Sequence, residues 1–249
     1  LTQGLVQNPK AFERHYNAER TMPLPILTEL MPEQIARFME RGFNVPGVEL
    51  EVDPVRFYPH GSLAAHTIGY VQQEFKPEPE EDEEFTFIHR LPDYVGKTGI
   101  ETGFDAELRG EAGAKGILVN NIGYRIREET WLPPQPGKNV VLTLDLDLQK
   151  AAEEALMEGD PDTRGAAVVL NCRTGDILAM ASAPSYDLNM FVRTRDYPKE
   201  AWERLNDETL TPQFNRVLQG TYPAGSIFKV IVALAGFEAG VFDPSYVVH

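Results

Sequence analysis

The residues with the clearest potential for chemistry are Ser226 and Lys229, which stand three positions apart near the end of the chain. A turn-forming sequence, YPAG (residues 222–225), precedes them and a long apolar segment follows, so Ser226 is expected in the first turn of a helix. Residues three apart share one face of a helix, which lets the lysine amine reach the serine hydroxyl. A serine needs a base to attack a carbonyl, and a neutral lysine can serve as that base.

Two local features would activate such a serine. The apolar residues on either side of Lys229 are expected to bury its amine, and burial disfavours the ammonium form. The backbone N–H of Ser226, without a partner at a helix start, is available to stabilise a developing oxyanion. However, chance alone gives about one Ser-x-x-Lys pair in a chain of this length. The local residues therefore also fit an N-cap serine that is followed by a surface lysine.

Other kinds of chemistry find little support in the residue pattern. The five histidines show no spacing typical of a metal site, and no HExxH sequence is present. The single cysteine, Cys172, excludes a disulfide within the chain and a cysteine-based zinc site. Asp145 and Asp147 are better interpreted as residues at the start of a helix than as a catalytic carboxylate pair. We therefore expect neither a metal ion nor a cofactor.

The composition describes an acidic globular protein. The chain has 249 residues, of which 42% are hydrophobic and 24% charged, and this length suits one large or two modest domains. Its 23 basic and 38 acidic residues give a net charge of −15, which repels phosphate backbones and makes nucleic acid an unexpected partner. No run of 18 apolar residues and no signal-peptide pattern occurs in the sequence.

The N-terminal half contains few regular patterns. We expect a short amphipathic helix at Pro32–Arg41 and an alternating strand pattern, with a turn, at 48–59. The acidic segment Lys76–Glu84 has the composition of a solvated loop. A proline-rich joint at Leu132–Lys138 separates this half from a more regular one, and we place the domain boundary there.

The C-terminal half has a clearer succession of elements. We expect a strand at Val140–Asp145, a helix at Leu146–Gly159, two hairpin strands at 165–171 and 176–182, and a short helix at Glu200–Asn206. Asp147 is the candidate N-cap of the first helix. The helix that begins near Ser226 is apolar nearly all round, and a helix of that kind is expected in the centre of a domain.

Several long segments resemble the penicillin-binding transpeptidases. YPAGSIFKV is similar to their nucleophile motif, and three segments follow the order seen at the start of their transpeptidase domain: PGKNVVLTLDLDLQ, GAAVVLNCRTGDILAMASAPSYDLNMF and NRVLQGTYPAGSIFK. Upstream, GVELEVDPVRFYPHGSLAAHTIGYV and GKTGIETGFDAELRGEAGAKGILVNNIGYRIRE resemble the non-catalytic pedestal of the class B members. The VNN-G-R-I segment and the PPQPG joint are more similar to the elongation type than to the division type. The resemblance covers about residues 29–240 and favours the catalytic interpretation of Ser226 and Lys229.

This resemblance implies an α+β fold. An elongated, strand-rich pedestal (residues 1–135, with a head module at about 29–75) is expected before the first part of a transpeptidase domain (residues 138–249). That domain is β-lactamase-like, with helices packed on an antiparallel sheet.

The resemblance also implies an activity and partners. The expected function is that of a peptidoglycan D,D-transpeptidase, which cross-links stem peptides of lipid-linked or nascent glycan during cell-wall elongation. Ser226 would form the acyl-enzyme and Lys229 would be its base, and β-lactam antibiotics would acylate the same serine. The pedestal would bind and activate a SEDS-family membrane glycosyltransferase. The expected location is the bacterial cell membrane, with a single-pass anchor that is not in this chain and with these residues on the periplasmic side.

Two departures from the family pattern carry expectations of their own. Lys97-Thr98-Gly99 spells the KTG triad of the family, but it precedes Ser226, so we interpret it as a coincidence in a turn. The Ser-x-Asn and KTG motifs that follow the nucleophile in the family are not in this sequence. Residues 1–249 alone are therefore expected to be inactive.

Two other classes of function are the alternatives. A β-lactam sensor or β-lactamase-like hydrolase shares Ser-x-x-Lys, although such proteins generally lack a long pedestal. A non-catalytic scaffold for the glycosyltransferase would use the pedestal alone, with Glu29–Gln73 as the docking module and Arg56, Phe57 and Tyr58 as candidate interface residues.

Overall fold

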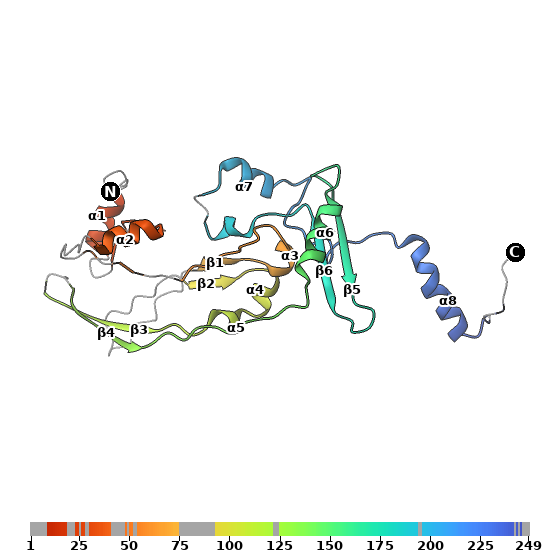
Figure 1. Ribbon diagram of the computed structural model, residues 1–249, viewed down its shortest axis with the longest axis horizontal. Coiled ribbons are helices and arrows are strands. Elements are labelled where there is room, and N and C mark those ends of the chain that lie inside the picture. Colours follow the sequence, from red (N-terminus) through yellow and green to blue (C-terminus); the bar gives the residue numbers. More distant parts are fainter. Residues whose placement is uncertain are drawn as a thin grey trace. The chain divides into compact units, whose positions relative to one another are not determined.

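The structure is a computed structural model, and it describes residues 9–18, 23–24, 26–27, 30–40, 48, 50–51, 54–74, 93–121, 125–193, 196–241, 243 and 245. Along the chain, pairs of strands alternate with one or more helices (Figure 1). The chain packs as two compact units, residues 1–56 with 106–140, and residues 57–105 with 141–249. Packing thus groups residues 57–105 with the C-terminal half. The domain boundary at the proline-rich joint Leu132–Lys138 remains a prediction from the sequence.

The described residues of the first unit form helices α1 (Pro9–Ala18) and α2 (Pro32–Glu40), most of helix α5 (Asp105–Arg109) and one hairpin. The hairpin consists of β3 (Ala114–Val119) and β4 (Arg125–Leu132). Helix α2 confirms the helix predicted at Pro32–Arg41, and none of its described residues is buried. In the antiparallel hairpin, a Cβ added to Gly116 would lie 2.4 Å from the Trp131 ring, so the indole covers this glycine. Helix α5 (Asp105–Arg109) precedes the hairpin.

The second unit begins with a small hairpin and two short helices. Strands β1 (Val71–Glu74) and β2 (Asp93–Gly96) pair antiparallel, with α3 (Ala65–Ile68) and α4 (Gly99–Gly103) beside them. Gly69 and Gly99 have φ values of +77° and +57°, and their backbones approach too closely for a Cβ to fit. These glycines let α3 and α4 meet.

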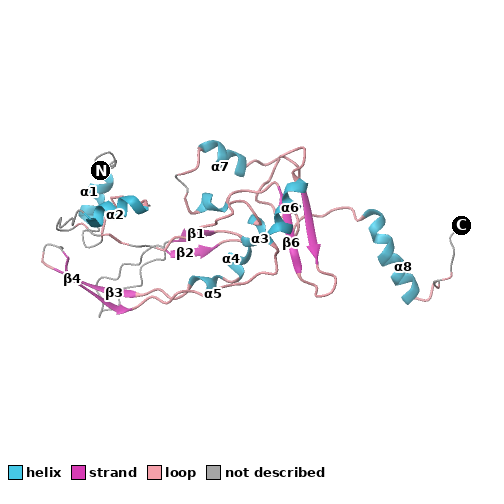
Figure 2. Cartoon of the chain, viewed as in Figure 1, coloured by secondary structure: helices cyan, strands magenta, loops and turns pink. Residues whose placement is uncertain are grey.

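The rest of the second unit confirms the layered arrangement predicted from the sequence. Helix α6 (Leu146–Leu156) packs on the antiparallel hairpin of β5 (Gly165–Leu170) and β6 (Ile177–Ala183), as Figure 2 shows. The buried Gln149 side chain donates to the Met180 carbonyl (3.1 Å) and accepts from the Met180 N–H (2.7 Å), which joins the helix to the sheet. The remaining elements are η1 (Leu188–Phe191), α7 (Lys199–Leu205), η2 (Gly225–Ile227) and α8 (Phe228–Glu238).

The core of this unit draws on both halves of the sequence. Its buried members are Tyr58, Ala65, Tyr186, Leu188, Met190 and Leu205. The Asn189 side chain bonds both the N–H (3.0 Å) and the carbonyl (2.9 Å) of Tyr58, more than 130 residues earlier in the chain. Tyr58, a candidate interface residue in the sequence, is therefore a core residue. Phe57, by contrast, is 60% exposed, with the Arg193 guanidinium 5.7 Å from its ring centre.

Three local predictions differ from the structure. Val140–Asp145 forms no strand; it lies along β6 with bonds from Asp145 N–H to Leu178 O and from Thr143 Oγ1 to Ile177 O. The N-cap of α6 is Asp145 and not Asp147, because only the Asp145 carboxylate is placed to accept from the first N–H groups. The described residues of 48–59 lie outside strands.

Among the residues that the structure describes, no helix has the length and apolar character needed to cross a membrane. The acidic segment Lys76–Glu84 lies outside the described residues.

Candidate active-site segment

Ser226 and Lys229 lie where the sequence predicted, at the start of the last helix. Ser226 is the middle residue of η2, which continues directly into α8. Lys229 is the second residue of α8. Within the described part of the chain, neither side chain makes a hydrogen bond, and both are exposed.

The burial predicted for this helix is not found in the structure. No residue of α8 is buried, and its apolar side chains are exposed on every face, for example Val230 at 64% and Leu234 at 62%. The described residues provide no surface against which α8 can pack.

The segment that leads to Ser226 is, in contrast, firmly held. Arg216 is buried, and its guanidinium donates to the carbonyl of Leu210 (2.6 Å) and to the carbonyl and hydroxyl oxygens of Thr211 (3.0 and 2.8 Å). A further bond reaches the Phe214 carbonyl at 3.3 Å. One side chain thus bonds the carbonyls of Leu210, Thr211 and Phe214 in the same loop. Burial lowers the pKa of its guanidinium.

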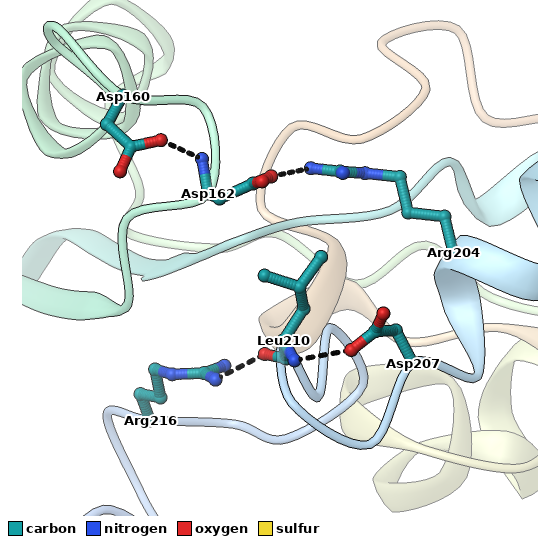
Figure 3. Close-up of polar contacts among 6 residues, drawn as sticks. All are labelled: Asp160, Asp162, Arg204, Asp207, Leu210 and Arg216. Carbon is teal, nitrogen blue, oxygen red and sulfur yellow. Dashed lines mark hydrogen bonds and ion pairs between the residues drawn. The ribbon is translucent and has the colours of Figure 1, made fainter.

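The same loop contains an acidic cap, and a surface ion pair lies just before it. Asp207 accepts from the N–H groups of Thr209 and Leu210, each at 2.8 Å, and these bonds lower the pKa of its carboxyl. Just before it, Arg204 pairs with Asp162 at 2.7 Å, as Figure 3 shows. The Arg204 pair is half exposed on both sides, so it contributes little to stability.

Two other elements fix the loop from outside. From β6, the Ser182 hydroxyl accepts from the Arg216 N–H (3.0 Å) and donates to the Phe214 carbonyl (3.4 Å). From α3, the buried His66 ring bonds the Pro212 carbonyl through Nε2 at 2.6 Å. Because a carbonyl only accepts, Nε2 is the protonated nitrogen of His66. Burial lowers the pKa of this imidazole, which keeps it neutral.

From Arg216 the chain turns back on itself before it reaches Ser226. The Asn215 side chain accepts from the N–H groups of Val217 and Leu218, each at 3.2 Å. A Cβ added at Gly220 would lie 2.5 Å from the Arg216 carbonyl oxygen and 2.7 Å from the Tyr222 ring. Only glycine fits there, and the close contacts extend to a residue four positions before Ser226.

Lys97-Thr98-Gly99 forms the bend between β2 and α4, in agreement with its interpretation as a turn. Lys97 follows β2 and pairs with Glu74 at 3.2 Å, and Gly99 begins α4 with φ +57°. Among the described residues, no group of three or more histidine, cysteine, aspartate or glutamate side chains is arranged to hold a metal ion.

Sequence reasoning did not identify the residues that hold this segment. Arg216 stands in the quoted NRVLQGTYPAGSIFK segment, and that position was its only signal. His66 and Ser182 also stand in quoted segments, but no local pattern indicated their partners, which lie 146 and 34 residues away.

Family models match most of the chain. The model described as "Penicillin-binding Protein dimerisation domain" matches residues 2–142, and that described as "Penicillin binding protein transpeptidase domain" matches residues 165–249. The chain therefore belongs to the penicillin-binding proteins, as its sequence predicted.

Within this family the chain is similar to one group of curated relatives. It is 38% identical to peptidoglycan D,D-transpeptidase MrdA of Escherichia coli K12 over 92% of the chain, and 33% identical to MrdA of Acinetobacter baumannii over 98%. It spans 37% and 35% of the length of these two relatives.

Solved structures show the same likeness. Penicillin-binding protein 2 (PBP2) of Pseudomonas aeruginosa, in complex with WCK 5153, is 39% identical, with a TM-score of 0.56 over 80% of this chain and 39% of that chain. PBP2 of Helicobacter pylori, in complex with MreC, is 30% identical, with a TM-score of 0.65 over 89% of this chain and 39% of that chain. A component of a peptidoglycan synthase complex is 33% identical, with a TM-score of 0.66 over 96% of this chain and 44% of that chain. The elongation-type recognition is confirmed by these PBP2 and MrdA relatives.

Proposed function

We propose that the whole protein is a peptidoglycan D,D-transpeptidase that works through a serine acyl-enzyme. The observation that carries this proposal is the position of Ser226 and Lys229 inside the matched transpeptidase range, at the start of a helix whose preceding segment is held by Arg216. The curated relatives named peptidoglycan D,D-transpeptidase support the same activity.

The reaction is an acyl transfer onto and off Ser226. The serine Oγ forms a bond to the carbonyl carbon of the penultimate D-alanine of a stem peptide, while its proton passes to the Lys229 amine. The C–N bond to the terminal D-alanine then breaks, and the leaving amine takes up a proton. An amine of a neighbouring stem peptide attacks the acyl carbon, and Oγ leaves and regains its proton.

A β-lactam would be trapped by the same first step, since its strained amide presents an acyl carbon to Ser226 and its leaving group stays attached. The test is to incubate the full-length protein with a fluorescent penicillin, digest it and locate the label. We expect the label only on the peptide that contains Ser226, and none in Ser226→Ala. Ser245→Ala, which removes an exposed serine hydroxyl outside α8, is the matched control and should be labelled normally. Label on another peptide would refute the assignment.

The proposed partners are nascent peptidoglycan, β-lactams and a SEDS-family glycosyltransferase on the periplasmic side of the bacterial cell membrane. A structural relative belongs to a peptidoglycan synthase complex, which supports such an assembly. The exposed helix α2 presents Glu33 and Arg37 to a partner. Charge reversal at these two positions should lower glycan polymerisation by the partner while labelling of Ser226 stays normal. Normal polymerisation and co-purification would place the docking surface elsewhere.

A further inference from the structure

Residues 215–222 precede η2 and α8, and we call them the 215–222 segment. This segment is anchored to the fold by hydrogen bonds, whereas no residue of α8 is buried. The first two residues of the segment are tied to three places in the fold: Arg216 to the loop carbonyls, its N–H to Ser182 of β6, and the Asn215 amide to the His66 carbonyl of α3 (3.4 Å). Further along the segment, the backbone of Gly220 lies close to the Arg216 carbonyl oxygen, and the Tyr222 ring lies beside Gly220.

Backbone strain marks the point where the loop meets Arg216. Thr211 has φ +42°, a left-handed conformation that a β-branched residue rarely adopts. Such a conformation persists only where its surroundings impose it. Here the Arg216 guanidinium bonds both the carbonyl and the hydroxyl of Thr211.

We propose that the 215–222 segment positions Ser226 for acylation, with Arg216 as its positioning residue and Gly220 as the point that sets its path. This proposal rests on the proposed function. Neither residue is expected to touch the reacting atoms. They act because the chain is anchored at Arg216, ten residues before the serine, and the close approach at Gly220 then sets the path toward Ser226.

The pedestal part of the sequence takes part in this positioning. His66 lies on α3, within the range matched by the dimerisation-domain model. Its ring nevertheless donates to the Pro212 carbonyl, in the same loop whose carbonyls Arg216 bonds. A change at His66 should therefore be felt at Ser226, although the two residues are 160 positions apart in the chain.

The test compares two glycine variants of the full-length protein. In Gly220→Ala, the new Cβ would meet the Arg216 carbonyl at 2.5 Å, so the 215–222 segment must shift. Gly103→Ala is the matched control, since a Cβ at Gly103 meets nothing within 4 Å. Stopped-flow acylation by a fluorescent penicillin separates the rate constant of acylation from the Kd of the complex before acylation. Thermal unfolding is measured on the same samples.

We expect Gly220→Ala to lower the acylation rate constant about 10²-fold, because an ångström-scale displacement of a reacting group has an effect of that order. Its Kd should stay close to that of Gly103→Ala, and the loss of rate should be present at temperatures well below its unfolding midpoint, which a loss of stability alone would not produce. Equal rate constants for the two variants would overturn the proposal. Unmodified protein that fails to label at Ser226 would instead overturn the proposed function.

A second pair of variants decides the matter where Gly220→Ala does not fold. Thr211→Val removes the hydroxyl that Arg216 bonds and keeps the shape of the side chain, whereas Thr211→Ser keeps the hydroxyl. The valine variant should be acylated several-fold more slowly than the serine variant, with equal Kd. His66→Gln should likewise retain more of the rate than His66→Ala, because an amide N–H can replace the imidazole donor. Indistinguishable rate constants within both pairs would refute the role of the segment.

Discussion

Helices α6 and α8 have the same length, 11 residues, but α6 is packed on a sheet whereas no residue of α8 is buried. Helix α6 is only moderately apolar, yet its Asp145 cap is formed and it packs on β5 and β6. Helix α8 is far more apolar, yet it has no side-chain cap and no buried residue. Apolar content alone therefore does not decide which helix is packed.

The difference lies in where each helix finds its contacts. The residues that bond α6 side chains are nearby in space and belong to the described chain, such as Met180 of β6 and Ala64, just before α3. A helix that is apolar all round needs apolar surfaces on all sides, and the described residues offer α8 none. The candidate residue Lys229 thus lies on a helix with no buried residue, and the candidate Ser226 lies just before it.

The largest effect is expected at Lys229. In the full-length protein, Lys229→Ala should slow acylation by about 10²- to 10⁴-fold, because the serine loses its base. The measurement is the rate of labelling by a fluorescent penicillin. Lys150→Ala, which removes an exposed lysine from α6, is the matched control and should acylate at the normal rate. Equal rates for both variants would show that α8 does not provide the base.

The next effect contrasts a core leucine with one on α8. Leu188 is fully buried, so Leu188→Ala should lower the free energy of unfolding by about 2–5 kcal/mol through lost contacts and a cavity. Leu234 is 62% exposed, and in the 249-residue chain Leu234→Ala should change the unfolding midpoint in urea little. A large loss in the second variant would mean that α8 packs in this chain after all.

The cap of α6 offers a smaller and sharper contrast. Asp145→Ala removes the carboxylate that accepts from the N–H groups of Asp147 and Leu148, which should cost about 0.5–2 kcal/mol in the free energy of unfolding. Asp147→Ala leaves this cap in place and should cost less. Urea unfolding of both variants compares the cap seen in the structure with the one predicted from the sequence. The opposite ranking would favour Asp147.

The smallest effect concerns the buried carboxyl of α6. Burial raises the pKa of Glu153, whose Oε1 accepts from Ala64 N–H (2.7 Å) and Gln149 Nε2 (2.8 Å). The folded state therefore keeps its proton at pH values where the unfolded chain has lost it. From the unfolded pKa of about 4.3 up to the raised folded pKa, this group makes stability fall as pH rises.

Glu153→Gln should remove that contribution, because its amide oxygen still accepts both bonds and carries no titrating proton. Thermal unfolding across this pH range should show a flatter dependence for the variant than for the unchanged protein. Glu154→Gln, an exposed neighbour on the same helix, should leave the dependence unchanged. Identical slopes for Glu153→Gln and the unchanged protein would contradict the raised pKa.

The sequence by itself determined the family, the catalytic candidates and several local elements. Helix α2, the β5–β6 hairpin, helix α7 and the turn at Lys97-Thr98-Gly99 follow from periodicity and turn residues, because these signals act over a few neighbouring positions. Ser226 and Lys229 were predicted from one motif and its resemblance to the family.

The tertiary structure alone decided how these pieces are held. The grouping of residues 57–105 with the C-terminal half, the pairing of His66 with Pro212 and the cap at Asp145 in place of Asp147 depend on long-range packing or on backbone geometry. The exposure of α8 likewise depends on which surfaces surround it. Periodicity reports which residues prefer burial, but only the folded chain determines whether a partner surface is there.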